Sequence, residues 1–190
     1  MYMDRRELIK MITVLTGGAF IGGELLLSGC KNEPTMGGSV FNAEDVAFLD
    51  EVADTILPPT KSPGAKAAKV GQFMTVMVND TYNESDQKIF HEGIGKLNEA
   101  SKKANGKSFM ESTPEQRTTF LTALDKEAKE YQKNKKKEDP THYFTLMKQL
   151  TLFGYFTSKE GATQALRYIA VPGKYEGCID YKKGDKAWAT

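Results

Sequence analysis

The sequence predicts an all-α fold of about six helices in a single domain, with an ordered C-terminal coil, preceded by a cleaved signal peptide and a short tether. Three observations support this prediction. Apolar residues recur at the period of an amphipathic helix through most of residues 41–190. Proline, glycine and helix-capping residues separate these periodic segments. No segment of useful length alternates apolar and polar residues in the way that a half-buried strand does.

The first predicted helix begins after Asn42, whose side chain can accept hydrogen bonds from the free amides of the first turn. Pro58 and Pro59 end it, because proline has no amide hydrogen and clashes with the preceding turn. A rigid turn follows over residues 58–64. The apolar residues expected on the inward face of this helix are Val46, Leu49, Val52, Ala53 and Ile56.

Three further helices are predicted in the middle of the chain. One ends near residue 79, the next runs from Ser85 towards Gly106, and the third opens with a capping box at residues 113–116. The charged run that follows is expected to be a solvated helix end with pairs such as Lys126 and Glu130. The predicted inward-facing residues are Val70, Phe73, Met74, Met77, Val78, Ile89, Phe90, Ile94, Leu97, Phe120, Leu121, Leu124 and Ala128.

The last two predicted helices begin at Asp139 and Ser158. Their expected apolar faces contain Phe144, Met147, Leu150 and Thr151, thickened by Leu152, Phe153, Tyr155 and Phe156, and then Ala162, Ala165, Leu166 and Ile169. Glycine and proline break regular structure in the final twenty residues. Large side chains there would be unfavourable in water, so this tail is expected to pack on the helices or on a partner. These side chains are Tyr175, Ile179, Tyr181 and Trp188.

Charge and motif patterns exclude several functional classes. The 26 Lys and Arg residues nearly balance the 25 Asp and Glu residues, which argues against a nucleic-acid-binding protein because such a protein needs a basic face. The sequence has no phosphate-binding loop, nucleophile elbow, zinc-ligand spacing or dinucleotide fingerprint. We therefore predict no catalytic residue, metal site or cofactor in this chain. His91 and His142 are interpreted as helix-surface residues, and Cys178 as a half-buried apolar residue.

Residues 1–29 have the pattern of a cleaved signal peptide. Arg5 and Arg6 precede two apolar residues and a lysine, which resembles the twin-arginine export signal. A positive segment followed by an apolar one also fits the general secretory route, and both routes remain open. The apolar segment carries Gly17, Gly18, Gly22, Gly23 and Glu24, whereas a retained membrane helix would have about 20 apolar residues without a carboxylate.

The signal peptide ends in a lipobox, Leu27-Ser28-Gly29-Cys30. Small residues before the cysteine admit the signal peptidase, and the Cys30 thiol receives the diacylglycerol. Residues 30–40 are then a lipidated tether, and residues 41–190 the folded domain. The sequence thus predicts a membrane-anchored lipoprotein of the bacterial cell envelope. We expect it to face the periplasm, but the sequence leaves both its facing and the choice of inner or outer membrane open. Lipidation of Cys30 leaves Cys178 without a disulfide partner in the mature chain.

Three segments resemble landmarks of the gluconate 2-dehydrogenase subunit 3 family. Residues 54–65 resemble that family's helix-to-turn signature, and residues 154–162 and 172–178 resemble its second and third landmarks, all in the same order. The resemblance covers residues 41–188. A departure is the lipobox, since many members of the family have a twin-arginine leader alone. We refer to these segments as the first, second and third landmarks.

The resemblance implies a role as a small, non-catalytic partner of a membrane-associated sugar or alcohol dehydrogenase. The large partner in this family is a flavoprotein of the glucose-methanol-choline type, which holds FAD, often with a cytochrome c that receives electrons. The alternative is a stand-alone envelope lipoprotein that acts as a scaffold or small-ligand binder. Because each landmark places aromatic or apolar residues beside a helix break, we predict partner-binding residues there and at the C-terminus: Pro58, Pro59, Pro63, Gly64, Tyr155, Phe156, Tyr175 and Trp188.

Overall fold

The computed structural model describes residues 41–171, 173–174 and 176–189. The predicted signal peptide and tether lie outside the described residues, and so does Tyr175. The predictions for Arg5, Arg6, Leu27, Ser28, Gly29 and Cys30 therefore concern a part of the chain for which no structure is given.

The described residues form five α-helices and one π-helix, which confirms the predicted all-α class. No strand is present among them, and the sole bridge of the β type in this part of the chain pairs Arg167 with Trp188. No helix in the described ranges is both long and apolar enough to span a membrane. The helices are α2 (Ala43–Ile56), α3 (Val70–Thr81), α4 (Glu84–Asn105), α5 (Pro114–Asn134), α6 (Tyr143–Thr157) and η2 (Gly161–Ala165).

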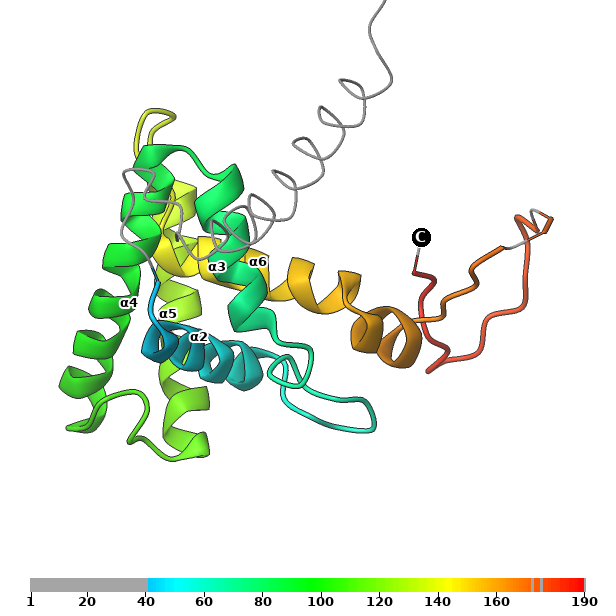
Figure 1. The fold of residues 1–190 in the computed structure, drawn as a ribbon, viewed down its shortest axis with the longest axis horizontal. Helices are drawn as coiled ribbons and strands as arrows, with labels where there is room; N and C mark the ends of the chain where they lie inside the picture. Colours follow the sequence, from blue (N-terminus) through cyan, green and yellow to red (C-terminus); the bar gives the residue numbers. More distant parts are fainter. Residues whose placement is uncertain (1–40, 172, 175, 190) are drawn as a thin grey trace, which may run out of the picture. The chain divides into compact units, whose positions relative to one another are not determined.

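Helix α6 is the centre of the fold. It contacts α2, α3, α4 and α5, and these four helices also contact one another in sequence, with α5 returning to α2 (Figure 1). The four therefore form a ring around α6. A helix surrounded in this way must be apolar on most of its circumference, and seven of its residues are buried: Phe144, Leu146, Met147, Leu150, Thr151, Gly154 and Tyr155.

Local capping chemistry sets most of the helix ends. The predicted capping box between Thr113 and Gln116 is present, and the predicted cap Asn42 forms a second capping box with Asp45. Helix α6 begins later than predicted, at Tyr143. The reason is that the His142 side chain caps this helix by accepting a hydrogen bond from the Phe144 amide, at 3.2 Å. His142 is therefore a capping residue rather than a helix-surface residue.

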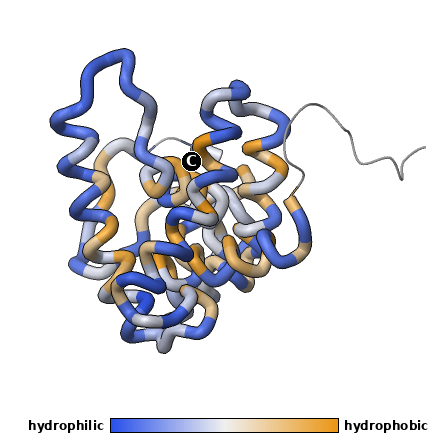
Figure 2. Tube along the Cα trace, turned by 90° about the vertical axis from the view of Figure 1, so that its left-hand side faces the viewer, coloured by the Kyte–Doolittle hydropathy of each residue, from blue (hydrophilic) through white to orange (hydrophobic). Residues whose placement is uncertain are grey.

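The hydrophobic core follows the predicted inward faces of α2 to α5. Hydrophobic and hydrophilic positions alternate at short intervals along the helices (Figure 2), as expected for amphipathic packing. Four core residues were not predicted: Phe48, Ala65, Phe109 and Leu146. Phe109 lies in the α4–α5 connection, where no helical period exists, yet it is fully buried between Phe48 and Phe120.

The structure corrects the predictions for the region after residue 151. Leu152, Phe153 and Phe156 do not thicken the core but are exposed on the last turns of α6. The helix predicted after Ser158 is reduced to the short π-helix η2, and Ile169 beyond it is exposed. Cys178 is exposed rather than half-buried. The described apolar residues of the tail are also exposed, so the tail does not bury them on the helices.

Candidate partner-docking surface

The first landmark folds into a tightly bonded turn between α2 and α3. The Ala65 amide donates to the Leu57 carbonyl at 2.9 Å, and the Lys66 amide donates to the Asp54 carboxylate at 3.1 Å. Gly64 is buried beneath this turn, where a Cβ atom would collide with the Asp54 carboxylate and the Pro59 ring. The chain needs glycine at this position for close packing, so Gly64 shapes the turn and does not present a docking surface.

Tyr155 joins the second landmark to the first. Its hydroxyl donates a hydrogen bond to the Pro63 carbonyl at 2.7 Å, and its side chain is 4% exposed. This burial differs from the docking role predicted for Tyr155, because an aromatic ring inside the core cannot contact a partner. The reason is its place on α6: Tyr155 faces the turn, whereas the neighbouring Phe156 faces away from the core and is exposed.

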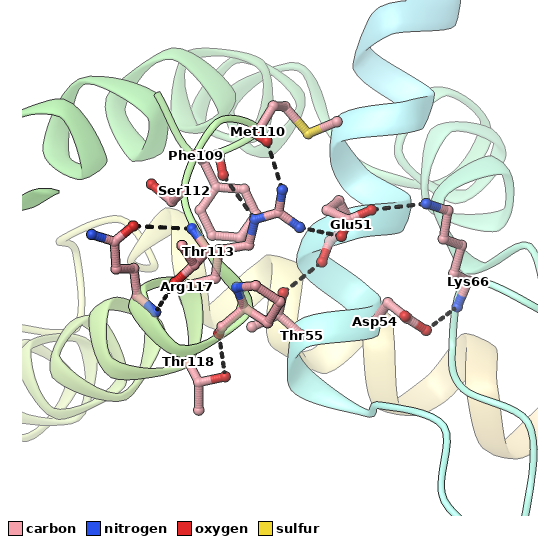
Figure 3. Close-up of polar contacts among 12 residues, drawn as sticks. Glu51, Asp54, Thr55, Lys66, Phe109, Met110, Ser112, Thr113, Arg117 and Thr118 are labelled. Atoms are coloured by element: carbon pink, nitrogen blue, oxygen red, sulfur yellow. Dashed lines mark hydrogen bonds and ion pairs between the residues drawn. The ribbon is translucent and has the colours of Figure 1, made fainter. Parts of the chain in front are cut away.

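A network of charged side chains joins α2 and Lys66, which flank the first landmark, to α5 (Figure 3). The Arg117 guanidinium forms an ion pair with Glu51 of α2, and it donates to the carbonyls of Phe109 at 2.9 Å and Met110 at 2.6 Å. Its charged carbon also lies over the Phe109 ring, 5.4 Å from the centroid. Glu51 completes the network by pairing with Lys66 at 2.8 Å.

The protonation behaviour of Glu51 follows from this network. Burial raises the pKa of Glu51, but the hydrogen bond from Lys66 and the positive charge of Arg117 outweigh burial, so its pKa lies below the usual value. The same contact raises the pKa of Lys66, through its hydrogen bond to Glu51. Glu51 and Lys66 therefore carry their charges near neutral pH, and the network holds α2, Lys66 and α5 together.

Sequence reasoning did not identify Arg117, although a signal was present. Arg117 stands four residues before Leu121 and therefore lies on the same inward face of α5 as that buried residue. A charged residue on such a face needs a partner, and the partner is Glu51, 66 residues earlier in the chain. No local pattern links these two positions.

The described residues contain no group of three or more His, Cys, Asp and Glu side chains that could hold a metal ion. His91 is half-buried on α4, where its ring stacks on Phe41 with the centroids 4.0 Å apart. Burial lowers the pKa of both His91 and His142. Both histidines make structural contacts: His91 stacks on Phe41, and His142 caps α6. Among the described residues they do not form a metal-binding group with Cys178.

Exposed apolar side chains gather in the C-terminal part of the chain. Of the twelve large hydrophobic residues that are exposed in the described ranges, nine lie between Leu152 and Trp188. At the end of α6 the exposed Phe153 ring packs edge-on against Phe73 of α3, with the centroids 5.6 Å apart. The nine residues are Leu152, Phe153, Phe156, Tyr168, Ile169, Val171, Ile179, Tyr181 and Trp188.

The predicted docking residues are thus divided by the structure. The exposed ones are Pro58, Pro59, Phe156 and Trp188. Pro63 is half-buried, and the buried ones are Gly64 and Tyr155. The turn and the end of α6 lie side by side because the Tyr155 hydroxyl bonds to Pro63. The candidate docking surface therefore consists of the exposed residues around these two landmarks and of the segment that follows η2.

The gluconate 2-dehydrogenase subunit 3 family model matches residues 43–173, which include all six helices and the first two landmarks. This chain belongs to the gluconate 2-dehydrogenase subunit 3 family. No curated protein and no solved structure matches it. The family match ends within the third landmark, so most of the tail, including Ile179, Tyr181 and Trp188, lies beyond it.

Proposed function

We propose that this subunit is a non-catalytic accessory protein that binds, matures or anchors a flavoprotein dehydrogenase of the glucose-methanol-choline type in the bacterial envelope. The family description names a numbered subunit of a dehydrogenase, which supports the existence of partner subunits. The observation that carries the proposal is the concentration of exposed apolar side chains between Leu152 and Trp188. Large exposed apolar patches on soluble domains mark protein or membrane contacts.

The rigidity of the domain around this surface supports protein docking. The second landmark is held to the first by Tyr155, and α2, which leads into the first landmark, is held to α5 through Glu51 and Arg117. A surface on such a scaffold changes little when a partner binds, which reduces the entropic cost of association. Aromatic anchors supply much of the energy of protein interfaces, and Phe156 and Trp188 are exposed residues of that kind.

Attachment to the membrane through Cys30 completes the proposed function. In this arrangement the lipidated cysteine holds the subunit at the membrane, and the tether over residues 30–40 separates the lipid from the folded domain. The flavoprotein, which contributes FAD, would then be retained at the envelope by the docking surface. A cytochrome c that accepts electrons is a further expected component of this complex.

The lipid anchor predicts the effect of a single substitution. Two or more acyl chains give stable membrane attachment, whereas one chain gives marginal attachment. Cys30→Ala is therefore expected to release the domain from the membrane fraction or to leave an unprocessed precursor, as judged by cell fractionation and intact mass. Cys178→Ser serves as the matched control and should be retained like the wild type. Equal processing and retention of Cys30→Ala would show that the chain is not a lipoprotein.

The proposed partnership predicts where flavin will be found. The subunit produced alone is expected to be colourless, whereas the affinity-tagged full chain recovered from detergent extracts of its native host should bring a flavoprotein with about one FAD per complex. Absorbance spectra and dehydrogenase activity of the two samples test this. Flavin in the subunit made alone would contradict the non-catalytic role. A native sample without flavoprotein would instead favour a stand-alone lipoprotein.

A further inference from the structure

The tail after η2 is closed into a loop by contacts between its two ends. The Arg167 amide donates to the Ala187 carbonyl at 2.7 Å, and the Ala189 amide donates to the Arg167 carbonyl at 2.9 Å. The Arg167 guanidinium lies over the Trp188 ring, 4.7 Å from its centroid. Lys186 adds a hydrogen bond to the Gln164 carbonyl in η2. We call residues 167–188 the C-terminal loop, and the Arg167–Trp188 contact its clasp.

The C-terminal loop exposes large apolar side chains although its ends are fixed. Val171 is 81% exposed and Tyr181 is 75% exposed, with Tyr168, Ile169 and Ile179 also exposed. A loop that only connected elements would be expected to place polar residues at such positions. The described part of this chain does not bury these side chains. A partner that covered them would remove their apolar surface from water, which would stabilise the complex.

The charge of the C-terminal loop differs from that of the helical domain. Residues 166–190 contain five Lys and Arg residues against three Asp and Glu residues, a net charge of +2, whereas residues 43–165 contain 17 against 18, a net charge of −1. The acidic residues of the loop are interleaved with its cations, and Lys174 pairs with Glu176 at 2.6 Å. A membrane-binding segment would show a continuous basic face instead. This pattern favours an acidic, partly apolar protein surface.

We propose that the C-terminal loop is a preformed docking element that inserts its apolar side chains into a depression rimmed by carboxylates on the flavoprotein subunit. This inference rests on the proposed function and assigns the docking to one segment. The clasp holds the loop closed before binding, so less conformational entropy is lost when the partner binds. Val171, Ile179 and Tyr181 make the apolar contacts, and Lys182 and Lys183 face the acidic rim.

The test uses the tagged full chain and, as the probe, the flavoprotein that co-purifies with the wild-type subunit. Val171→Ser with Tyr181→Ser is expected to raise the Kd by at least about tenfold, since truncation of buried anchors has effects of this size. Trp188→Ala, which opens the clasp, should weaken binding several-fold. Trp188→Phe keeps an aromatic ring under Arg167 and should restore most of the affinity. Met110→Ser, an exposed apolar residue of the α4–α5 connection, is the control and should bind like the wild type.

Charge reversal gives a second, independent test. Lys182→Glu with Lys183→Glu leaves the apolar side chains in place and is expected to slow association and to reduce its dependence on salt. Circular-dichroism melts should match the wild type for all these variants, because the replaced side chains lie outside the core.

The outcomes separate the two proposals. If the wild-type chain brings down no flavoprotein, the proposed function is wrong and the assignment of the loop falls with it. If the wild-type chain binds the flavoprotein and both the apolar and the charge variants bind it equally well, the loop is not the docking element, while the function stands. Loss of membrane retention with unchanged flavoprotein binding would assign the loop to lipid and would overturn the inference.

Discussion

Tyr155→Ala is expected to lower the free energy of unfolding by about 3 to 5 kcal/mol, the range for truncating a buried aromatic residue. The ring is 4% exposed, so its removal leaves a cavity between α6 and the first landmark. The Pro63 carbonyl also loses the hydroxyl that donates to it at 2.7 Å. For a domain whose stability is on the order of 5 to 15 kcal/mol, this loss is large. Urea or thermal unfolding measures it.

The adjacent residue supplies a matched control. Phe156→Ala removes a ring of similar size that is exposed at the end of α6, so the expected loss of stability is at most about 1 kcal/mol. Tyr155→Phe keeps the ring but removes the hydrogen bond and should cost about 1 to 2 kcal/mol. Similar melts for the alanine variants of Tyr155 and Phe156 would contradict the different positions of these two rings. Phe156→Ala should instead weaken recovery of the flavoprotein.

Arg117→Ala is expected to destabilise the domain by about 3 kcal/mol. Removal of one member of a buried ion pair leaves the other charge uncompensated, which costs roughly 3 to 5 kcal/mol when burial is complete. Here the Arg117 and Glu51 side chains are 12% and 20% exposed, and Glu51 keeps its pair with Lys66, so we expect the lower end of that range. The carbonyls of Phe109 and Met110 also lose their donors. Denaturant unfolding of the variant measures the loss.

Two comparisons isolate the contribution of this network. Lys96→Ala removes an exposed pair with Glu92 on the surface of α4 and should leave stability nearly unchanged. A double-mutant cycle of Arg117→Ala and Glu51→Gln should show coupling of about 1 kcal/mol or more. Additive effects of the two substitutions would mean that Arg117 stabilises the domain through its carbonyl contacts alone.

The same network makes stability depend on pH, and the sign follows from the lowered pKa of Glu51. The unfolded state binds a proton on this carboxyl more readily than the folded state does. Stability from Glu51 is therefore fully present above its ordinary pKa of about 4.5 and is lost as the pH falls through the lower pKa of the folded state. Arg117→Ala should reduce this acid sensitivity, since the charge of Arg117 contributes to the lowered pKa.

Most of the helical framework could be predicted because its signals are local. The capping boxes at Asn42 and Thr113 and the stop at Pro58 each involve residues within one helical turn. The inward faces of the helices before α6 follow from periodicity, which reports burial whenever one face meets the core and the opposite face meets water. On α6 the four predicted periodic residues are buried, but periodicity could not separate the buried Tyr155 from its exposed apolar neighbours at the end of the helix, because apolar residues surround most of that turn.

The segments that make up the docking region could be predicted from the sequence. Which of their side chains are buried and which are exposed could not. The resemblance at the three landmarks indicated the family from the residues alone, and the family match confirms it. Nothing in the local sequence separates Tyr155 from Phe156, since both are aromatic residues on one apolar helix. Their different burial depends on the turn at Pro63, which packs against only one of them.

The sequence by itself determined the family and most helix limits before α6, because each depends on residues close together in the chain. Only the tertiary structure decided which side chains are buried on α6, that Arg117 pairs with Glu51, and that Arg167 and Trp188 close the C-terminal loop. These contacts join residues between 21 and 92 positions apart. Their formation depends on how four helices close around a fifth, and no local preference of the chain encodes that arrangement.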